Sequence, residues 1–216
     1  MLGSLIVLKI LVDLFRVDLY LIMIEDRKEY KFKLNRRQLN NFFISNIKFI
    51  EPLHKERIIT SLYMDTEDFY LYHLSNTNDI GKYKFRFRKY SNEKKIFQEI
   101  KQNSQEGRKK EVLLSSFNDL DNIQYIEYRT MILKPAVLIN YKREYYSFKN
   151  SRITVDSSIN YSPTKNRSLT NSVINCNFII LEYKLLGNDI DIEKDLFQNP
   201  ISFSKYNDSV NKLYYL

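Results

Sequence analysis

The run Lys82-Tyr83-Lys84-Phe85-Arg86-Phe87-Arg88 carries the clearest structural pattern in this chain. Cations occupy every second position, and the aromatic residues Tyr83, Phe85 and Phe87 lie between them. Successive side chains of a β-strand point to opposite faces, so this run predicts a strand with one cationic and one apolar face.

The same alternation recurs in other segments, and three of them place a Glu-x-Lys pair on one face: Glu29 with Lys31, Glu99 with Lys101, and Glu182 with Lys184. If the charged faces turn inward and the apolar faces pack outward against helices, the sheet closes into a barrel with a charged lumen. A lumen lined mainly by cations repels itself when empty. The pattern therefore predicts a bound polyanion, with the carboxylates holding a divalent cation that bridges to it.

The remaining pattern indicates an α+β protein, in which an antiparallel barrel of about eight strands is flanked by helices. Strands are expected at 27–34, 58–65, 82–90, 96–102, 108–114, 137–148, 152–159 and 173–186. Helices are expected at 36–46, 66–74, 116–133, 191–197 and 205–216, and a polar loop at 160–172. Asn35 and Thr66 are the expected N-caps of the first two helices.

Residues 1–24 are dense in Leu, Ile and Val, but Lys9, Asp13 and Arg16 interrupt them at helical spacing. A membrane-spanning helix tolerates few such charges. We expect an amphipathic, mostly apolar helix that packs on the remaining domain, residues 25–216, or on a protein partner. A peripheral membrane contact is the alternative.

The composition limits the chemistry. The 216 residues include 34 Lys and Arg and 26 Asp and Glu, a formal charge of +8, which requires an anionic partner. The four glycines are too widely spaced for a Walker or dinucleotide-binding loop. With one cysteine and two distant histidines, neither a disulfide nor a zinc site is expected, and the chain suits the cytoplasm, with membrane association as an alternative. Any catalysis would rest on arginine, lysine and carboxylates.

Eight runs, taken in order, resemble the polyphosphate polymerase domain of the VTC (vacuolar transporter chaperone) type, a member of the triphosphate tunnel metalloenzymes, which are related to CYTH proteins. The resemblance covers about residues 27–210. The runs are Arg27–Phe32, Ile59–Asp65, Lys84–Tyr90, Phe97–Lys101, Tyr141–Tyr145, Arg152–Asp156, Ile180–Lys184 and Ser204–Tyr206.

The resemblance implies a tunnel that binds ATP through its phosphates and Mn²⁺ or Mg²⁺, and that transfers the terminal phosphoryl group to a growing polyphosphate chain. The catalytic residues it implies are Arg86, Arg88, Lys101 and Arg143. The implied substrate-binding residues are Lys31, Lys84, Lys110, Arg152, Lys184 and Lys205, with Arg108 and Lys109 as further candidates. The implied metal ligands are Glu182, Glu29 and Glu99.

The first strand departs from the Glu-x-Glu-x-Lys pattern of CYTH hydrolases and cyclases, because Arg27 stands in place of the first glutamate. One carboxylate fewer weakens the case for a second, water-activating metal and favours a polymerase. A tripolyphosphatase or nucleoside triphosphatase of the same fold and a non-catalytic polyphosphate-binding subunit stay open as alternatives. We expect a stand-alone domain without the regulatory and transmembrane domains of vacuolar subunits.

A nucleic-acid-binding module is the rival from another class. Stacking platforms need aromatic and cationic side chains on one face, whereas Tyr83, Phe85 and Phe87 lie opposite the cations. ATP and polyphosphate are therefore the expected partners, and nucleic acid is not.

Overall fold

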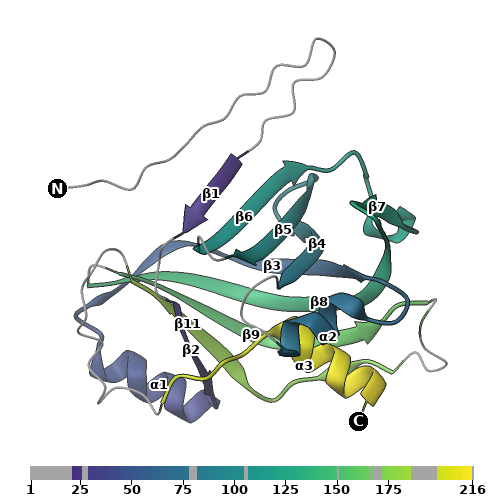
Figure 1. Cartoon of the computed structure of the whole chain (residues 1–216). Helices are drawn as coiled ribbons and strands as arrows, with labels where there is room; N and C mark the ends of the chain where they lie inside the picture. Colours follow the sequence, from purple (N-terminus) through teal and green to yellow (C-terminus); the bar gives the residue numbers. More distant parts are fainter. Residues whose placement is uncertain are drawn as a thin grey trace.

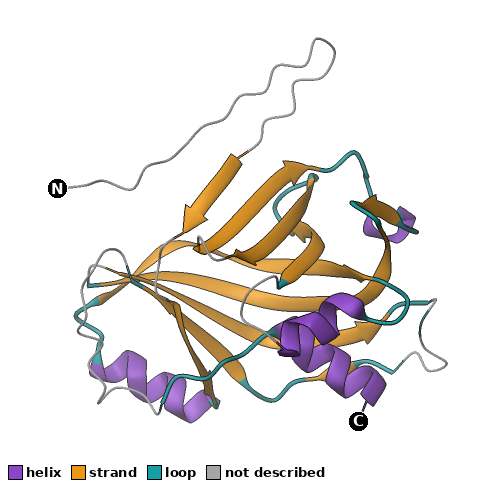
Figure 2. Ribbon diagram, viewed as in Figure 1, coloured by secondary structure: helices purple, strands orange, loops and turns teal. Residues whose placement is uncertain are grey.

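The computed structural model describes residues 21–25, 29–77, 82–104, 107–149, 151–165, 167, 172–185 and 199–215, with only the backbone for 21–25, 104, 107 and 108. Eleven strands and three α-helices make up this described part (Figures 1 and 2). The strands are β1 (Leu21–Glu25), β2 (Glu29–Leu34), β3 (Ile50–Asp65), β4 (Tyr83–Tyr90), β5 (Ile96–Ser104), β6 (Gly107–Leu114), β7 (Ile126–Tyr128), β8 (Met131–Phe148), β9 (Ser151–Pro163), β10 (Ile174–Asn175) and β11 (Ile179–Lys184). The helices are α1 (Arg36–Ser45), α2 (Tyr70–Thr77), the 3₁₀-helix η1 (Leu120–Asn122), α3 (Lys205–Val210) and the π-helix η2 (Asn211–Tyr215).

All strand pairs are antiparallel, and the strand order is β1-β6-β5-β4-β3-β8-β9-β11-β2, with β10 on β9 and β7 on β8. Figure 1 shows the sheet curling, so that β4, β5 and β6 lie across from β11 and β2. The register aligns the charged faces: Arg86 lies opposite Glu99 on β5 and opposite Tyr63 on β3. The cationic faces predicted from the alternation therefore share one concave surface.

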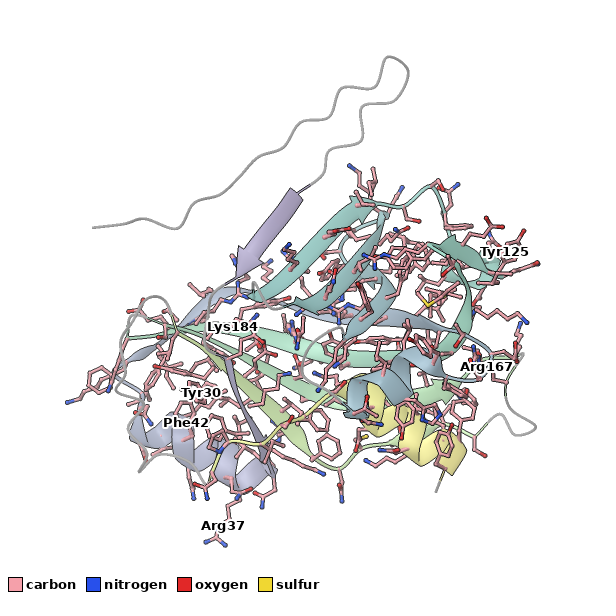
Figure 3. The ribbon with its side chains drawn as sticks, in the orientation of Figure 1. Tyr30, Arg37, Phe42, Tyr125, Arg167 and Lys184 are labelled. Atoms are coloured by element: carbon pink, nitrogen blue, oxygen red, sulfur yellow. The ribbon has the colours of Figure 1, made fainter. Side chains whose placement is uncertain are left out.

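The apolar face of the sheet is covered by helices. Asn35 accepts a hydrogen bond from the Gln38 N–H at 2.9 Å, and the Gln38 side chain accepts one from the Asn35 N–H at 2.8 Å. This capping box begins α1 as predicted. The helix then buries Leu39 and Phe42 against the apolar side of β2, β9 and β11, while Arg37 projects outward (Figure 3).

The helix α3 packs instead on the concave side. Tyr206 of α3 stacks on Tyr63 with 4.9 Å between ring centroids, and both lie in a buried cluster with Val210 and Ile139. The Tyr206 hydroxyl donates to the buried carboxylate of Asp65, which also accepts from the N–H groups of α2. One carboxylate thus links the end of β3 with α2 and α3.

The expected closed barrel is wrong in one respect: within the described residues, the end strands β1 and β2 are not hydrogen-bonded to each other. Residues 201–204, here called the C-terminal strap, occupy the edge of β2 instead. The Ile201 N–H donates to the Lys31 carbonyl at 2.8 Å, and Lys31 Nζ donates to the Phe203 carbonyl at 3.0 Å. Lys84 Nζ on β4 donates to Ser204 Oγ at 2.9 Å, so the strap links β2 with β4.

The predicted helix at 116–133 is also wrong. This segment forms η1, β7 and the start of β8. Its apolar residues Leu120 and Ile123 pack against the apolar face of β4, next to Phe85 and Phe87. A short turn followed by extended chain buries these apolar residues as a helix would. The spacing of Leu120 and Ile123 therefore did not distinguish the two structures.

Other boundaries differ by less. Residues 1–20 and 191–197 lie outside the described residues, but Leu21–Glu25 pair with β6, so the expected helix is wrong for residues 21–24. The strand β3 begins at Ile50 rather than at residue 58, and β9 extends to Pro163, into the expected loop. Thr66 Oγ1 accepts from the Tyr70 N–H at 2.9 Å, but α2 begins only at Tyr70. None of the described helices has the length and apolar character needed to cross a bilayer.

Candidate functional site

The charged concave face encloses two cavities that share six lining residues. The larger, here called the inner chamber, has a volume of about 370 Å³, and the smaller, here called the vestibule, about 280 Å³. The structure brings ten predicted cations together around the inner chamber: Lys31, Lys84, Arg86, Arg88, Lys101, Lys110, Arg143, Arg152, Lys184 and Lys205. Glu29 and Glu182 line it as well, and Lys109 lines the vestibule. The side chain of Arg108 lies outside the described part of the chain.

Glu99 fixes two of the arginines. Its carboxylate accepts from Arg86 Nε at 2.8 Å and from Arg88 Nη1 at 3.2 Å, and Lys110 Nζ lies 3.5 Å away. Burial would raise the pKa of Glu99, which is 2% exposed, but the two guanidinium groups hold that pKa well below its usual range. Glu99 does not line the inner chamber; it lies behind the arginines that do.

Two tyrosine hydroxyls complete the hold on these arginines. Tyr63 accepts from Arg86 Nη1 at 2.8 Å, and Tyr141 accepts from Arg88 Nη2 at 3.2 Å. Partners on two sides hold each planar guanidinium in one orientation before any ligand arrives. Sequence reasoning missed both tyrosines, although the register places Tyr63 directly opposite Arg86.

A second buried carboxylate, Asp156, organises the opposite wall. Its two oxygens accept from Arg143 Nε and Nη2 at 2.6 and 2.7 Å, and Lys205 Nζ donates to it at 2.5 Å. Burial would raise the pKa of Asp156, but Arg143 and Lys205 lower it. This residue was not among the predicted site residues. It shares the charged face of β9 with Arg152, so the same period-two alternation could have identified it.

The carboxylates of Glu29 and Glu182 lie on either side of one lysine. Lys184 Nζ is 2.7 Å from Glu29 Oε1 and 3.1 Å from Glu182 Oε1 (Lys184 is labelled in Figure 3). Burial would raise the pKa of Glu182, but Lys184 and Lys31 hold it well below its usual range. Both groups are therefore anionic at neutral pH.

These oxygens suit a hard divalent cation. Mg²⁺ is typically held by one or two protein carboxylates, with substrate phosphates and water completing its octahedron. Thr154, opposite Glu182 in the sheet, adds a buried hydroxyl oxygen with no hydrogen-bond partner among the described residues. No group of three or more His, Cys, Asp or Glu side chains suited to a metal occurs in that part of the chain. The donor set fits a metal shared between protein and phosphate.

Two lysines in the chamber are unusually acidic. Burial, together with the charges of Lys31 and Lys101, lowers the pKa of Lys84 to about 7. Burial and the neighbouring Arg86 likewise lower the pKa of Lys101 to about 7. In the ligand-free chamber, Lys84 and Lys101 are therefore only partly protonated at neutral pH.

A curled antiparallel sheet with preoriented arginines and lysines of lowered pKa on its concave face forms a site whose charge and geometry suit a compact polyanion rich in oxygen acceptors. The family model of the VTC domain matches residues 9–124 and 115–214. The chain therefore belongs to the VTC domain family, which confirms the resemblance drawn from the sequence runs.

One solved structure agrees on the fold. A Bacillus halodurans protein described as a candidate adenylate cyclase has a TM-score of 0.51 and 15% identity, over 77% of this chain and 82% of that one. A protein of Pyrococcus horikoshii OT3 has a TM-score of 0.48 and 14% identity, over 86% of this chain and 99% of that one. The first likeness supports the fold alone. Curated protein sequences gave no match.

Proposed function

We propose that this chain is a polyphosphate polymerase that transfers the terminal phosphoryl group of ATP to a growing polyphosphate chain. The observation that carries the proposal is the inner chamber, in which buried carboxylates preorient Arg86, Arg88 and Arg143 toward one volume. Membership of the VTC domain family supports it. The site thus combines guanidinium groups in fixed orientations, which can donate to phosphate oxygens, with a cavity of limited size.

The arginines would bind the phosphates of ATP through paired N–H donors. The planar guanidinium matches two phosphate oxygens at once, whereas a lysine acts as a point charge. Arg86 and Arg88 project from β4 and Arg143 from β8, so the triphosphate would be held from two walls. Phosphoryl transfer asks little covalent chemistry of the protein, and positioning with charge stabilisation supplies most of the rate.

Glu182 and Glu29 would hold the divalent cation, which when bound neutralises phosphate charge and orients the oxygens it shares. Lys184 is paired with both carboxylates, and it would move to phosphate when the cation takes its place beside them. Because Glu99 is already saturated by Arg86, Arg88 and Lys110, we reassign it from metal ligand to a positioning residue for the arginines.

In the proposed step, a terminal phosphate oxygen of the polyphosphate chain attacks the γ-phosphorus of ATP. The bond between that phosphorus and the β,γ-bridging oxygen breaks, ADP leaves, and the chain grows by one phosphate. The nucleophile is itself a phosphate, so no nucleophilic side chain is needed. Arg86, Arg88 and Lys101 would stabilise the charge on the transferring group.

The test is to supply ATP with Mn²⁺ and to measure ADP, inorganic phosphate and long polyphosphate together. The polymerase should form one ADP for each phosphate that is incorporated into polyphosphate. Equal amounts of ADP and free phosphate would replace the proposal with hydrolysis. Tight polyphosphate binding without any ADP would replace it with a non-catalytic binding subunit.

Matched variants tie the reaction to the chamber. Arg86→Ala, Arg88→Ala and Glu182→Ala should abolish turnover while the far-ultraviolet circular dichroism spectrum stays native. Lys142→Ala is the control, because Lys142 pairs with Glu56 and Glu144 outside the chamber. Full activity in all three chamber variants would contradict the assignment of the site.

A further inference from the structure

The two cavities differ in the kind of cation that lines them. The inner chamber is lined by six lysines and also by five arginines: Arg57, Arg86, Arg88, Arg143 and Arg152. In the vestibule, every cation among the described lining residues is a lysine: Lys31, Lys82, Lys84, Lys101, Lys109 and Lys110. Among the described residues, ammonium groups therefore line both cavities, whereas guanidinium groups line the inner chamber alone.

This difference has a physical meaning for a polyanion. A guanidinium held by a carboxylate offers a fixed pair of donors, which suits phosphates that must stop in one geometry. An ammonium on a flexible stem follows a phosphate chain without fixing its register. Fixed sites suit the reacting triphosphate, and the lysine-lined vestibule suits a chain that moves.

Part of the chamber wall that the vestibule does not share carries aromatic side chains. His54 and Tyr145 meet edge to face at 5.7 Å between ring centroids. The guanidinium carbon of Arg57 lies 5.7 Å from the ring centre of Tyr90 and 5.9 Å from that of Tyr145. All four side chains line the inner chamber and none lines the vestibule. Such a group can stack on a nucleobase.

Arg57, the arginine of this aromatic group, is already partly paired, which makes this end a weaker exit for polyphosphate. Arg57 Nη1 lies 3.8 Å from Glu93, so part of its charge is already offset. Along β4, Tyr90 marks this aromatic end and Lys84 lies at the border with the vestibule. They are six positions apart, which is about 20 Å of extended strand. The two ends of the lined path are thus chemically distinct and well apart.

We propose that the tunnel is directional: the base of ATP stacks at the His54, Arg57, Tyr90 and Tyr145 end, and polyphosphate leaves past Lys82 and Lys109 in the vestibule. This inference rests on the proposed function and adds the orientation of both ligands. It assigns Tyr90 and Tyr145 to recognition of the nucleoside, and the vestibule lysines to the product chain.

The test compares dissociation constants by isothermal titration calorimetry for three probes: ATP, inorganic tripolyphosphate and a long polyphosphate. Tyr145→Ala and Tyr90→Ala should each weaken the affinity for ATP by about fivefold or more, which is the effect of losing one base stack. The affinity for tripolyphosphate should change little. The double variant Lys82→Ala with Lys109→Ala should weaken the affinity for long polyphosphate by a larger factor than the affinity for ATP. Lys89→Ala, on the opposite face of β4, is the control for both. Tyr145→Leu keeps apolar volume at this wall and tests the stack if the alanine variant unfolds.

The outcomes separate the two proposals. If the wild-type protein binds neither ATP nor tripolyphosphate, the proposed function fails. If it binds both but the tyrosine variants weaken ATP and tripolyphosphate equally, only the direction fails, because the aromatic end would then hold phosphate. A larger loss of ATP affinity in the lysine variant than in the tyrosine variants would reverse the direction.

Discussion

At the scale of single residues, Glu99 and Asp156 are carboxylates whose partners are the cations of the site. Each is fully or almost fully buried, and each holds at least two cations in place. Breaking such a cluster leaves an uncompensated buried charge, which is costly. Neither lines the inner chamber, so we expect them to position its cations without contacting a ligand.

Glu99→Gln tests whether this residue positions arginines or binds metal. The neutral amide should loosen Arg86 and Arg88, lowering kcat by roughly 10- to 100-fold, the range for losing a hydrogen bond between charged groups. Affinity for Mn²⁺, measured by calorimetry, should stay at the wild-type value, whereas Glu182→Gln should weaken it. A parallel loss of Mn²⁺ affinity in both variants would restore Glu99 as a metal ligand.

The pKa of about 7 at Lys84 predicts a pH-dependent affinity. A bound polyanion favours the charged ammonium and raises its pKa, so binding takes up a proton wherever the ligand-free lysine is neutral. Affinity for tripolyphosphate should therefore be highest below pH 7 and fall by up to about tenfold per pH unit above it.

Calorimetry in two buffers with different ionisation enthalpies measures this proton uptake directly. At pH 8 the wild-type protein should take up protons on binding tripolyphosphate, and Lys84→Met should take up fewer. Identical uptake in the two proteins would assign the linkage to other groups, such as Lys101.

The site residues that could be predicted were those on alternating strands. Lys84, Arg86 and Arg88 share one face because a strand has a period of two, and the structure places all three around one chamber. Tyr63 and Tyr141 were missed because an isolated tyrosine in a strand is ordinary core material. Their contacts with the arginines depend on which strands are neighbours, and local pattern does not contain that information.

At the scale of elements, α3 and the C-terminal strap complete a sheet that does not close through β1 and β2. Two of the three hydrogen bonds that hold the strap use backbone groups, the Ile201 N–H and the Phe203 carbonyl, and the third uses the Ser204 hydroxyl, so side-chain identity carries little signal for it. The alternation in β4 predicted a strand face correctly. The spacing of Leu120 and Ile123 failed, because a 3₁₀ turn places apolar residues three apart much as an α-helix does.

Tyr206→Phe tests how α3 is anchored. The change removes the hydroxyl that donates to buried Asp65 and leaves the carboxylate with one donor fewer. We expect the free energy of unfolding to fall by about 1–3 kcal/mol, measured by urea denaturation. Tyr125→Phe, at an exposed side chain, is the control and should change stability little. An unchanged midpoint for Tyr206→Phe would mean that stacking on Tyr63 alone holds the helix.

At the scale of the whole molecule, the excess of 8 positive charges is gathered largely on one concave face. Like charges in a partly desolvated cavity repel each other, so the ligand-free state is strained electrostatically. A polyanion that enters the cavity relieves this repulsion and binds only the folded state.

Inorganic tripolyphosphate should therefore raise the melting temperature. At a concentration of 100 times its Kd, the gain in unfolding free energy is about 2.7 kcal/mol. For a chain of this size that corresponds to a shift of roughly 5–10 °C, followed by differential scanning fluorimetry. Orthophosphate at the same concentration should give a smaller shift, and the effect should shrink with added salt. Equal shifts for the two anions would mean that the cavity does not bind tripolyphosphate in preference to orthophosphate.

The position of Lys205 late in the sequence has a consequence for synthesis on the ribosome. Lys205 and the strap reach across to Asp156, Lys31 and Lys84, and β2 pairs with β11 roughly 150 residues further along the chain. A nascent chain can form the β3–β6 hairpins early, but it cannot assemble the chamber until residue 205 has left the exit tunnel. A nascent chain interrupted before residue 205 should therefore lack the complete nucleotide site, so synthesis past this point sets the earliest possible turnover.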